Sequence, residues 1–412
     1  MERVILHSDM NSYYASVEMM LNPSLKGKAM AVGGSTEKRN GIILAKSDLA
    51  KKAGVKTAMA LWEARQCCPN LIIVHPQYDQ YIKYSKMARE IYSRYTDRIE
   101  PFGMDECWLD VTESVSLFGS GEKIAEEIRQ TIKAELGLTV SIGVSFNKVF
   151  AKLGSDMKKP DAITVITRDN FKEKIWGLPV GELLFVGYAT KKKLNKCGVM
   201  TIGDLARFPG YLLKSKLGKN GLMIHAYANG QDIAPVMPIG YEMPVKSVGH
   251  GITCIADLEN NEEVCNVMQE LSQDIGNKLR KYGLAARGIQ ISVRDKNLYD
   301  KQWQTQMEHS TQCASDIAAA AKKLFIASYR WTDNVRAVTV RAINLIPAQA
   351  PMQISLFNDE ERREKLLNIE KSIDEIRRRF GYDSITYATL MGNLKMPNHQ
   401  EYRPEMPSAR RI

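Results

Sequence analysis

At 412 residues, 44% of them hydrophobic and 25% charged, the chain is long enough for roughly two to four domains. It has no apolar run near the ~18 residues of a membrane span, no signal-peptide pattern at its N-terminus and no C-x-x-C spacing among its seven cysteines. These features argue against a membrane protein, a disulfide framework and a structural zinc site. We therefore expect a cytoplasmic protein, and its net charge of +10 indicates a polyanionic partner.

The first part of the chain predicts a mixed sheet covered by helices. A strand is expected over residues 3–9 and a helix over YYASVEMML, residues 13–21. A small module from about residue 27 to 75 is entered through the turn-rich GGSTEKRNG. Periodicity then predicts helices at 78–96 and 121–136, a hairpin at 98–112 and the alternating strand TVSIGVSF at 139–146. This order of elements is typical of one mixed sheet with helices packed on it.

The second part predicts short helices followed by another α/β unit. Residues 166–240 carry 11 Lys/Arg against 5 Asp/Glu, so the positive charge is concentrated there. Four strands are expected at 247–254, 287–294, 302–309 and 335–343. The prolines of IPAQAP, residues 346–351, predict a linker. Beyond it we expect a charged helix over 358–380 and a disordered, proline-containing tail.

Three carboxylates are the strongest candidates for chemistry. Asp105 and Glu106 fall at the bend of the hairpin within PFGMDECWLD, and Asp9 ends the first strand. If these strands are neighbours, the three negative charges converge and repel unless cations neutralise them. Hard oxygen ligands suit Mg²⁺, and two such ions ~3.5–4 Å apart catalyse phosphoryl displacement. Taken alone, however, the pair also fits a solvated hairpin tip, and Asp9 also fits a helix cap.

Three longer segments carry a family resemblance. HSDMNSYYASVE at 7–18, PFGMDECWLDVT at 101–112 and SIGVSFNKVFAKLGSDMKKPDAITVI at 141–166 resemble the signature segments of Y-family DNA polymerases, and within them the bacterial DNA polymerase IV group. The resemblance continues in order to about residue 380. It implies an α+β multidomain, right-hand polymerase with a ferredoxin-like palm, small fingers, a helical helix-hairpin-helix thumb and an α/β little finger. The implied ranges are 1–30 and 76–166 for the palm, 31–75 for the fingers, 167–238 for the thumb, 239–346 for the little finger, and 347–412 for a linker, clamp-binding motif, charged helix and tail.

The resemblance also implies an activity. Such a protein is a template-directed DNA polymerase of low fidelity that performs translesion synthesis by two-Mg²⁺ nucleotidyl transfer and has no proofreading. Asp9, Asp105 and Glu106 would be the catalytic, metal-binding carboxylates, with the backbone carbonyl of Met10 helping to hold one Mg²⁺ ion. Primer-template DNA and a dNTP are the implied partners, and the protein is expected to be a monomer.

Further residues acquire roles in substrate binding from the same match. Tyr14 stands where the family has a steric gate against the ribose 2′-hydroxyl, and Tyr13 would support that pocket. Lys159, rather than its neighbour Lys158, matches a lysine that contacts the incoming triphosphate, as a point charge facing a polyanion can. The fingers depart from the pattern, because Asp48 and Lys51 replace a tyrosine and an arginine. Lys51 retains the charge but not the bidentate geometry of arginine.

DNA-binding residues are expected in the thumb and in the little finger. The segment VGYATKKKLNKCGVMTIGDLA resembles a helix-hairpin-helix, in which backbone N–H groups receive a DNA phosphate. Phe185 replaces the first glycine of its turn, and the lysine run alone also fits a solvated helix face. Lys246, in PVKSVGHGITC, would follow the template backbone. The candidate DNA-binding residues are Gly187, Lys191, Lys192, Lys193 and Lys246.

A pentapeptide after the linker predicts a protein partner. QISLF, residues 353–357, resembles the motif that binds bacterial polymerases to the sliding clamp. Gln353 would hydrogen-bond at one pocket, and Leu356 and Phe357 would fill an apolar one. A short buried strand or an accidental match would give the same letters.

Other functions share parts of this pattern. A nucleotide cyclase or another two-metal phosphotransferase can have a palm-like sheet with an acidic pair, but it needs neither thumb nor clamp motif. A non-catalytic DNA-damage accessory protein of the same fold typically loses the acids, and this chain has all three. The catalytic subunit of a polymerase V-like complex is left open.

Overall fold

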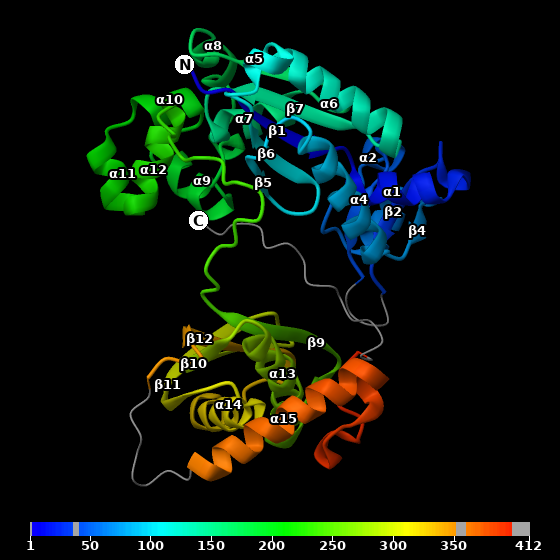
Figure 1. Cartoon of the computed structure of the whole chain (residues 1–412), viewed down its shortest axis with the longest axis vertical. Coiled ribbons are helices and arrows are strands. Elements are labelled where there is room, and N and C mark those ends of the chain that lie inside the picture. Colours follow the sequence, from blue (N-terminus) through cyan, green and yellow to red (C-terminus); the bar gives the residue numbers. More distant parts are fainter. Residues whose placement is uncertain (1, 36–40, 352–359, 398–412) are drawn as a thin grey trace. The chain divides into compact units, whose positions relative to one another are not determined.

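The computed structural model describes residues 2–35, 41–351 and 360–397. The chain forms two compact units, shown in Figure 1. Unit 1 comprises the chain up to Gly34 and from Ile42 to Tyr241, and unit 2 begins at Glu242. Within unit 1 we keep the names palm, fingers and thumb for the ranges given above. None of the helices in the described ranges is long and apolar enough to cross a membrane.

The palm is built on a five-stranded sheet with β1 at its centre. The strand order is β5-β6-β1-β7-β8, in which β1 is antiparallel to both neighbours and β7 is parallel to β8. The strands are β1 (Ile5–Met10), β5 (Ile99–Pro101), β6 (Glu106–Asp110), β7 (Val140–Ser145) and β8 (Ile163–Ile166). The predicted hairpin is present as the antiparallel pair β5–β6.

Helices cover both faces of this sheet. On one face the apolar side chains of α1 (Tyr13–Leu21), α4 (Tyr78–Tyr92) and α6 (Gly121–Leu136) form a common core with β1, β6 and β7, and the short α5 (Val115–Phe118) precedes α6. On the other face lies α7 (Lys148–Met157). Every residue of β1 and β7 is therefore buried. The alternation of TVSIGVSF identified the face toward α6 but not the second covered face.

Two glycines let α7 lie very close to the sheet. A Cβ atom on Gly143 of β7 would lie 1.9 Å from the Ala151 carbonyl oxygen and 2.6 Å from the Ser155 backbone nitrogen. A Cβ atom on Gly154 of α7 would lie 3.2 Å from the Cα of Gly143. Because backbone meets backbone at this point, no side chain can move aside to make room. The contact fixes the distance between α7 and the central strands.

The variant Gly143→Ala is expected to lower the free energy of unfolding by about 3 kcal/mol, because α7 must shift away from the sheet to accept the methyl group. Chemical denaturation followed by circular dichroism measures the change. Gly177→Ala is the matched control, since no atom lies within 4 Å of the position its Cβ would take. Equal stability of the two variants would contradict the close helix–sheet contact.

The fingers form a small three-stranded sheet with its own core. The strand order is β3-β2-β4, with β2 (Met30–Gly33), β3 (Ile43–Lys46) and β4 (Ile72–Val74). Two short helices, α2 (Asp48–Lys52) and α3 (Leu61–Cys67), accompany it. Side chains such as Ile43, Val55 and Leu61 are fully or almost fully buried between them.

The thumb is a group of short helices packed against the end of the palm. Its helices are α8 (Phe171–Ile175), α9 (Tyr188–Asn195), α10 (Ile202–Arg207), α11 (Gly210–Leu217) and α12 (Lys219–Ala228). Their core is continuous with Phe146, which directly follows β7, and with Phe150 of α7. The thumb is thus attached to the same helix that contacts the central sheet.

The chain that leaves the thumb is held on the palm over residues 230–239. Glu100 accepts hydrogen bonds from the Met237 backbone nitrogen at 3.0 Å and from the Lys148 ammonium at 2.7 Å, and both charged side chains are buried. The guanidinium of Arg3 donates to the Ala234 carbonyl at 2.9 Å. The backbone nitrogen of Ile239 donates to the Asp97 carbonyl at 2.8 Å. We call residues 230–239 the palm strap.

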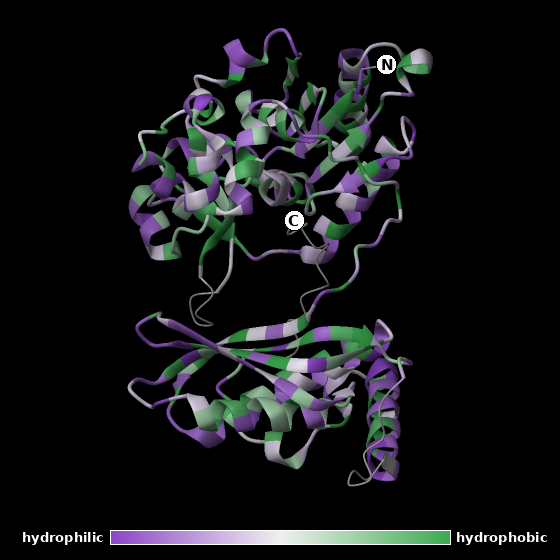
Figure 2. Ribbon diagram, turned by 90° about the vertical axis from the view of Figure 1, so that its left-hand side faces the viewer, coloured by the Kyte–Doolittle hydropathy of each residue, from purple (hydrophilic) through white to green (hydrophobic). Residues whose placement is uncertain are grey.

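Unit 2 is a four-stranded antiparallel sheet with two helices on one face. The strand order is β11-β10-β12-β9, with β9 (Val248–Leu258), β10 (Leu284–Asp295), β11 (Asp300–Thr311) and β12 (Val335–Pro347). Hydrophilic and hydrophobic residues alternate along these strands in Figure 2, and the hydrophobic set packs against α13 (Asn261–Lys281) and α14 (Ala314–Ser328). All four strands were predicted, but they are longer than expected. The predicted linker IPAQAP is partly wrong, because its first two residues end β12.

The C-terminal helix α15 (Glu360–Phe380) is docked on unit 2 through charged residues. Glu370 is buried and accepts hydrogen bonds from the Ala314 and Ser315 backbone nitrogens, at 2.8 and 3.2 Å. Arg280 of α13 donates to Glu370 at 2.6 Å and to Asp374 at 2.7 Å. Glu370 thereby supplies the N-terminal cap that α14 lacks in its own sequence.

The segment after α15 was expected to be disordered, and this expectation is wrong for residues 381–397. They form two short 3₁₀ turns, Tyr382–Ser384 and Ala388–Leu390. The Leu390 side chain is buried, and the Lys395 ammonium lies 2.8 Å from a Glu263 carboxylate oxygen. Contacts with α13 therefore hold this segment in place.

Candidate active site

The three candidate carboxylates meet at adjoining strand ends. Asp9, the penultimate residue of β1, is the direct cross-strand partner of Glu106, the first residue of β6. Asp105 lies in the turn just before β6, and its carbonyl accepts a hydrogen bond from the Met10 backbone nitrogen at 3.0 Å. The register of two antiparallel strands thus brings together acids almost 100 positions apart in the sequence.

The Asp105 carboxyl group carries the clearest sign of unbalanced charge. Burial raises its pKa, and the negative charges of Asp9 and Glu106 raise it further, to about 7. The nearby Lys152 ammonium compensates only in part. An acid whose pKa is raised by burial and by two acidic neighbours indicates a site that would accept another cation.

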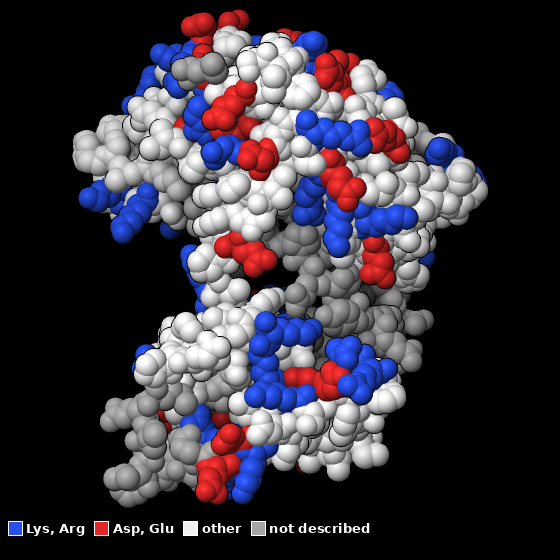
Figure 3. All heavy atoms as spheres, viewed as in Figure 1, with Lys and Arg blue, Asp and Glu red and all other residues white. Residues whose placement is uncertain are grey.

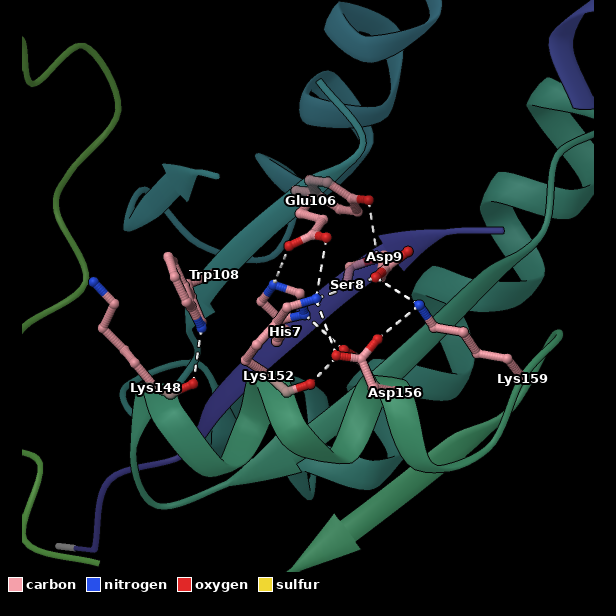
Figure 4. Close-up of polar contacts among 11 residues, drawn as sticks. His7, Ser8, Asp9, Glu106, Trp108, Lys148, Lys152, Asp156 and Lys159 are labelled. Atoms are coloured by element: carbon pink, nitrogen blue, oxygen red, sulfur yellow. Dashed lines mark hydrogen bonds and ion pairs between the residues drawn. The ribbon is translucent and has the colours of Figure 1, made fainter. Parts of the chain in front are cut away.

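Two lysines pair with the carboxylates, as Figure 4 shows. The Lys152 ammonium lies 3.0 Å from Glu106 Oε1 and 3.4 Å from Asp9 Oδ2. The Lys159 ammonium lies 2.8 Å from Asp9 Oδ2 and 2.8 Å from Asp156 Oδ1. Lys158 is also exposed, but in the described part of the chain it makes no ion pair with these carboxylates. Of the two adjacent lysines, Lys159 is therefore the one at the carboxylates.

A buried histidine lies beneath Glu106. His7 Nε2 is 3.4 Å from Glu106 Oε2, and His7 Nδ1 is 2.8 Å from Ser155 Oγ. Burial lowers the pKa of His7. Burial alone would raise the pKa of Glu106, but His7 and Lys152 together bring it below its ordinary value. Glu106 is therefore ionised at neutral pH.

Lys152, Asp156 and His7 were not predicted from the sequence to be site residues. Lys152 and Asp156 are four residues apart on α7, a spacing that is common on exposed helices, and His7 reads as an ordinary strand residue. Their role depends on the close approach of α7 to the sheet at Gly143 and Gly154.

The donor set fits a hard divalent cation. In the described ranges, no three His, Cys, Asp or Glu side chains are gathered closely enough to hold a metal ion as they stand. Lysine ammonium groups lie against Asp9 and Glu106. However, Glu106 Oε2 is buried and makes no hydrogen bond in the described structure, although His7 Nε2 lies 3.4 Å away, and the Asp105 charge is only partly balanced. Carboxylate oxygens with a spare acceptor and surplus negative charge are the ligands that Mg²⁺ prefers.

Two adjacent tyrosines differ in their surroundings. The Tyr14 ring stacks on Tyr81 with centroids 4.2 Å apart and planes 9° apart, and its hydroxyl lies 3.5 Å from the Met104 sulfur. Burial and the neighbouring Asp105 raise the pKa of Tyr14 to about 12. Tyr13 is 3% exposed and donates its hydroxyl hydrogen to the Tyr81 carbonyl. Tyr14 is thus the partly accessible ring near the carboxylates, and Tyr13 belongs to the core.

The fingers residues stand apart from this cluster. Asp48 begins α2 and Lys51 lies in its last turn, and both side chains are exposed. Neither makes a hydrogen bond or ion pair with the palm carboxylates. Their expected role at the triphosphate therefore has no contact of this kind to support it.

The thumb hairpin keeps its turn although a glycine is replaced. Phe185 adopts a left-handed backbone with φ of 68°, a conformation that costs a residue other than glycine about 1–2 kcal/mol. Its partly buried ring packs in the thumb core. Gly187 precedes α9, on which Lys191, Lys192 and Lys193 are all exposed.

A second copy of this pattern follows 23 residues later and was missed in the sequence. Phe185–Leu194 and Phe208–Leu217 share six of ten residues, in the pattern F-x-G-Y-x-x-K-x-K-L. In both copies the tyrosine is exposed, Tyr188 by 82% and Tyr211 by 74%, whereas the phenylalanine and the final leucine pack in the thumb core. Figure 3 shows Lys and Arg side chains projecting where α11 and α12 lie in Figure 1. The thumb thus presents two tyrosine–lysine surfaces rather than one.

Of the two other predicted binding segments, the structure describes only the one that contains Lys246. Lys246 is exposed just before β9 in unit 2. Gln353, Leu356 and Phe357 lie outside the described residues, so the clamp motif stays a prediction.

Comparison with known proteins gives matches over most of the chain. Residues 8–156 match the impB/mucB/samB family, residues 245–356 match the C-terminal domain of that family, and residues 182–232 match the thumb domain described for DNA polymerase-iota. The chain is 51% identical over 391 residues to DNA polymerase IV of Acetivibrio thermocellus, which covers 95% of this chain and 98% of that protein. It is 35% identical to DNA polymerase IV 2 of Bacillus subtilis, over 95% of each chain. A solved Y-family DNA polymerase chimera of Dbh and Dpo4 has the same fold, with a TM-score of 0.73 and 24% identity over 83% of this chain and 99% of the chimera.

Proposed function

The chain belongs to the Y family of DNA polymerases, close to DNA polymerase IV, and we propose that it is a template-directed DNA polymerase that copies damaged templates with low fidelity and without proofreading. The observation that carries this proposal is the convergence of Asp9, Asp105 and Glu106 beside Lys159. A non-catalytic accessory protein of the same fold would not need this cluster of charged residues. We further propose that the protein acts as a monomer on primer-template DNA with a dNTP as substrate.

Asp9, Asp105 and Glu106, with the Met10 carbonyl, would hold two magnesium ions. Bound there, the ions would favour deprotonation of the primer 3′-hydroxyl and stabilise the charge on the departing pyrophosphate. Lys159, whose ammonium lies 2.8 Å from Asp9 Oδ2, would supply a positive point charge to the triphosphate. Lys152 stays against Glu106 from its anchored position on α7 and limits the negative charge of the site.

Tyr14 would select the sugar of the incoming nucleotide. Its ring is held flat against Tyr81, so it cannot easily rotate away from a larger substrate. A ribose 2′-hydroxyl pressed against this ring meets a steric clash and loses hydrogen bonds to water. Deoxyribose meets neither penalty.

Phosphate contacts would hold the duplex. Exposed Lys191, Lys192 and Lys193 on α9, and Lys246 before β9, provide charge without sequence readout. Tyr211 and the exposed lysines of the second thumb copy would provide a second such surface. Affinity for DNA should therefore fall steeply with salt.

Primer extension on matched templates tests the activity. In the presence of Mg²⁺ and dNTPs, the protein should extend a primer on an undamaged template and also past a single abasic site. A mismatched primer end should not be shortened, since no proofreading is expected. ATP or GTP alone should give no cyclic product. Failure to extend either template would refute the polymerase, and arrest at the abasic site would refute translesion synthesis.

The clamp motif is a separate proposal with its own test. Deleting residues 353–357 should abolish binding to a bacterial sliding clamp and leave distributive primer extension within about twofold of wild type, because peptide motifs of this kind bind through a few anchor residues. Gel filtration of the protein with the clamp measures the first effect. As a matched control, deletion of residues 403–407 should leave clamp binding intact. Clamp binding retained without residues 353–357 would place the contact elsewhere.

A further inference from the structure

The loop that carries Lys159 connects α7 to β8. Helix α7 ends at Met157 and β8 begins at Ile163, so residues 158–162 make the connection. The Lys159 ammonium reaches back to the carboxylates and lies 2.8 Å from Asp9 Oδ2 (Figure 4). A lysine side chain is a compact charge on a long flexible stem. The position of its ammonium therefore depends on how firmly the backbone of the loop is held.

One side-chain amide joins this loop to the strand that carries Asp9. Asn11 Oδ1 accepts a hydrogen bond from the Asp161 backbone nitrogen at 2.9 Å. Asn11 Nδ2 donates to Ser141 Oγ of β7, also at 2.9 Å. Asn11 is buried, and these two hydrogen bonds engage both ends of its amide. We call the hydrogen bond between Asn11 and Asp161 the loop joint.

The loop joint is close in sequence to both charged groups of the ion pair. Asn11 follows Asp9 by two residues, and Asp161 follows Lys159 by two residues. The ion pair and the loop joint therefore close a small ring of chain. Because peptide units are planar, the backbone between the two members of each pair has few soft dihedral angles. A shift of Asp161 must consequently move Lys159 as well.

The side chain of Asp161 ties the same loop to α6. Its two carboxylate oxygens lie 2.7 Å from Arg129 Nη1 and 2.7 Å from the Lys133 ammonium. Burial alone would raise the pKa of Asp161, but Lys133 and Arg129 bring it below its ordinary value, so the carboxylate is ionised at neutral pH. The Asp161 backbone is left-handed, with φ of 54°, a conformation that a residue other than glycine keeps only when its surroundings hold it. The loop is thus fastened from β1 and from α6 at one residue.

We propose that Asn11 and Asp161 are positioning residues for the incoming triphosphate, because the loop joint and its tie to Arg129 hold Lys159 where it meets the nucleotide. Neither residue acts by touching the triphosphate: the Asn11 amide is already engaged, and the Asp161 carboxylate would repel a phosphate. The inference rests on the proposed polymerase function and on the role proposed for Lys159. It goes beyond them because it assigns nucleotide affinity to residues outside the set proposed to contact substrate or metal.

A double-mutant cycle on nucleotide binding tests the loop joint. The primer ends in a dideoxynucleotide, so that a dNTP binds with Mg²⁺ but is not incorporated, and the fluorescence of 2-aminopurine in the template reports its Kd. Lys159→Met should raise this Kd roughly thirtyfold, through loss of a contact to a charged group, and Asn11→Ala roughly tenfold, through its displacement. Adding Asn11→Ala to Lys159→Met should change the Kd by less than about twofold, because the joint acts through the lysine.

A second variant and a matched control accompany the cycle. Arg129→Met removes the tie from α6 without changing β1, and it should raise the Kd roughly threefold in the wild-type background and not in the Lys159→Met background. Asn170→Ala is the control, since Asn170 Oδ1 also accepts a backbone N–H at 2.9 Å, from Thr167. It should leave the Kd unchanged in both backgrounds. If Asn11→Ala does not fold, the cycle of Arg129→Met with Lys159→Met decides alone.

Three results would go against the proposal. Equal increases in Kd with and without Lys159 would show a general structural effect, and a wild-type Kd in both Asn11→Ala and Arg129→Met would show that the loop needs neither tie. If Lys159→Met leaves the Kd unchanged while wild type extends an unblocked primer, the inference fails and the polymerase function stands. Absence of extension by wild type refutes the polymerase function itself.

Discussion

Replacing Asp105 and Glu106 together by alanine is expected to reduce primer extension by at least about a thousandfold. Two of the three carboxylates proposed to hold the magnesium ions are then lost, and each bound ion stabilises the transition state by several kcal/mol. Single-turnover extension with saturating dNTP measures the effect. The positive surplus left by Lys152 and Lys159 should leave binding of primer-template DNA as tight as in wild type or tighter.

A matched pair of acids controls for the change in charge. Glu90→Ala with Glu122→Ala also removes two carboxylates from palm helices, but both side chains are exposed. This control should extend primers at the wild-type rate. If the Asp105 and Glu106 variant also extends normally, the catalytic site lies elsewhere in the protein.

Tyr14→Ala is expected to lower the preference for deoxynucleotides over ribonucleotides by roughly a hundredfold, because the clash with the 2′-hydroxyl disappears with the ring. The measurement is the ratio of kcat/KM for dATP to that for ATP. This ratio is insensitive to partial unfolding of the variant, which also loses the stack on Tyr81.

Tyr14→Phe is the matched control for the gate. It keeps the ring and removes only a hydroxyl whose contact is the Met104 sulfur at 3.5 Å. Sugar preference should be unchanged in this variant. If Tyr14→Ala also keeps the wild-type preference, another side chain performs the selection.

The palm was predictable because its signals are local or belong to long motifs. Helices α1 and α6 begin and end where the sequence indicated, and α6 in particular has an apolar face, a Ser120 N-cap and Gly137 at its C-terminus. The meeting of Asp9 with the hairpin acids followed from the assumption that two acid-bearing strands are neighbours. The roles of Tyr14 and Lys159 came from the family resemblance, and no periodicity could have supplied them.

Lys152 was not predictable from local patterns. Its position at the carboxylates depends on how closely α7 approaches β7, which depends on two glycines 11 positions apart. No local sequence pattern indicates that these two glycines are in contact. A charged residue on a helix is ordinarily solvated, and only the tertiary contact makes this one part of the site.

The C-terminal region shows the same limit. Pro347 was expected to open a linker, but a proline is tolerated as the last residue of a strand, where it pairs opposite Leu284. Residues 381–397 have no strong periodicity, and their order comes from distant partners such as Glu263. Order that depends on long-range ion pairs cannot be seen in local composition.

The palm strap limits the length of chain that connects the two units. Residues 230–239 are fastened to the palm, unit 1 ends at Tyr241 and β9 of unit 2 begins at Val248, so the connection between them is short. Six residues can extend at most ~20 Å, at ~3.3–3.6 Å each. When one unit holds a duplex, such a short tether gives the other an effective concentration in the millimolar range. The DNA contacts proposed for the thumb and for unit 2 would then act as one bivalent grip.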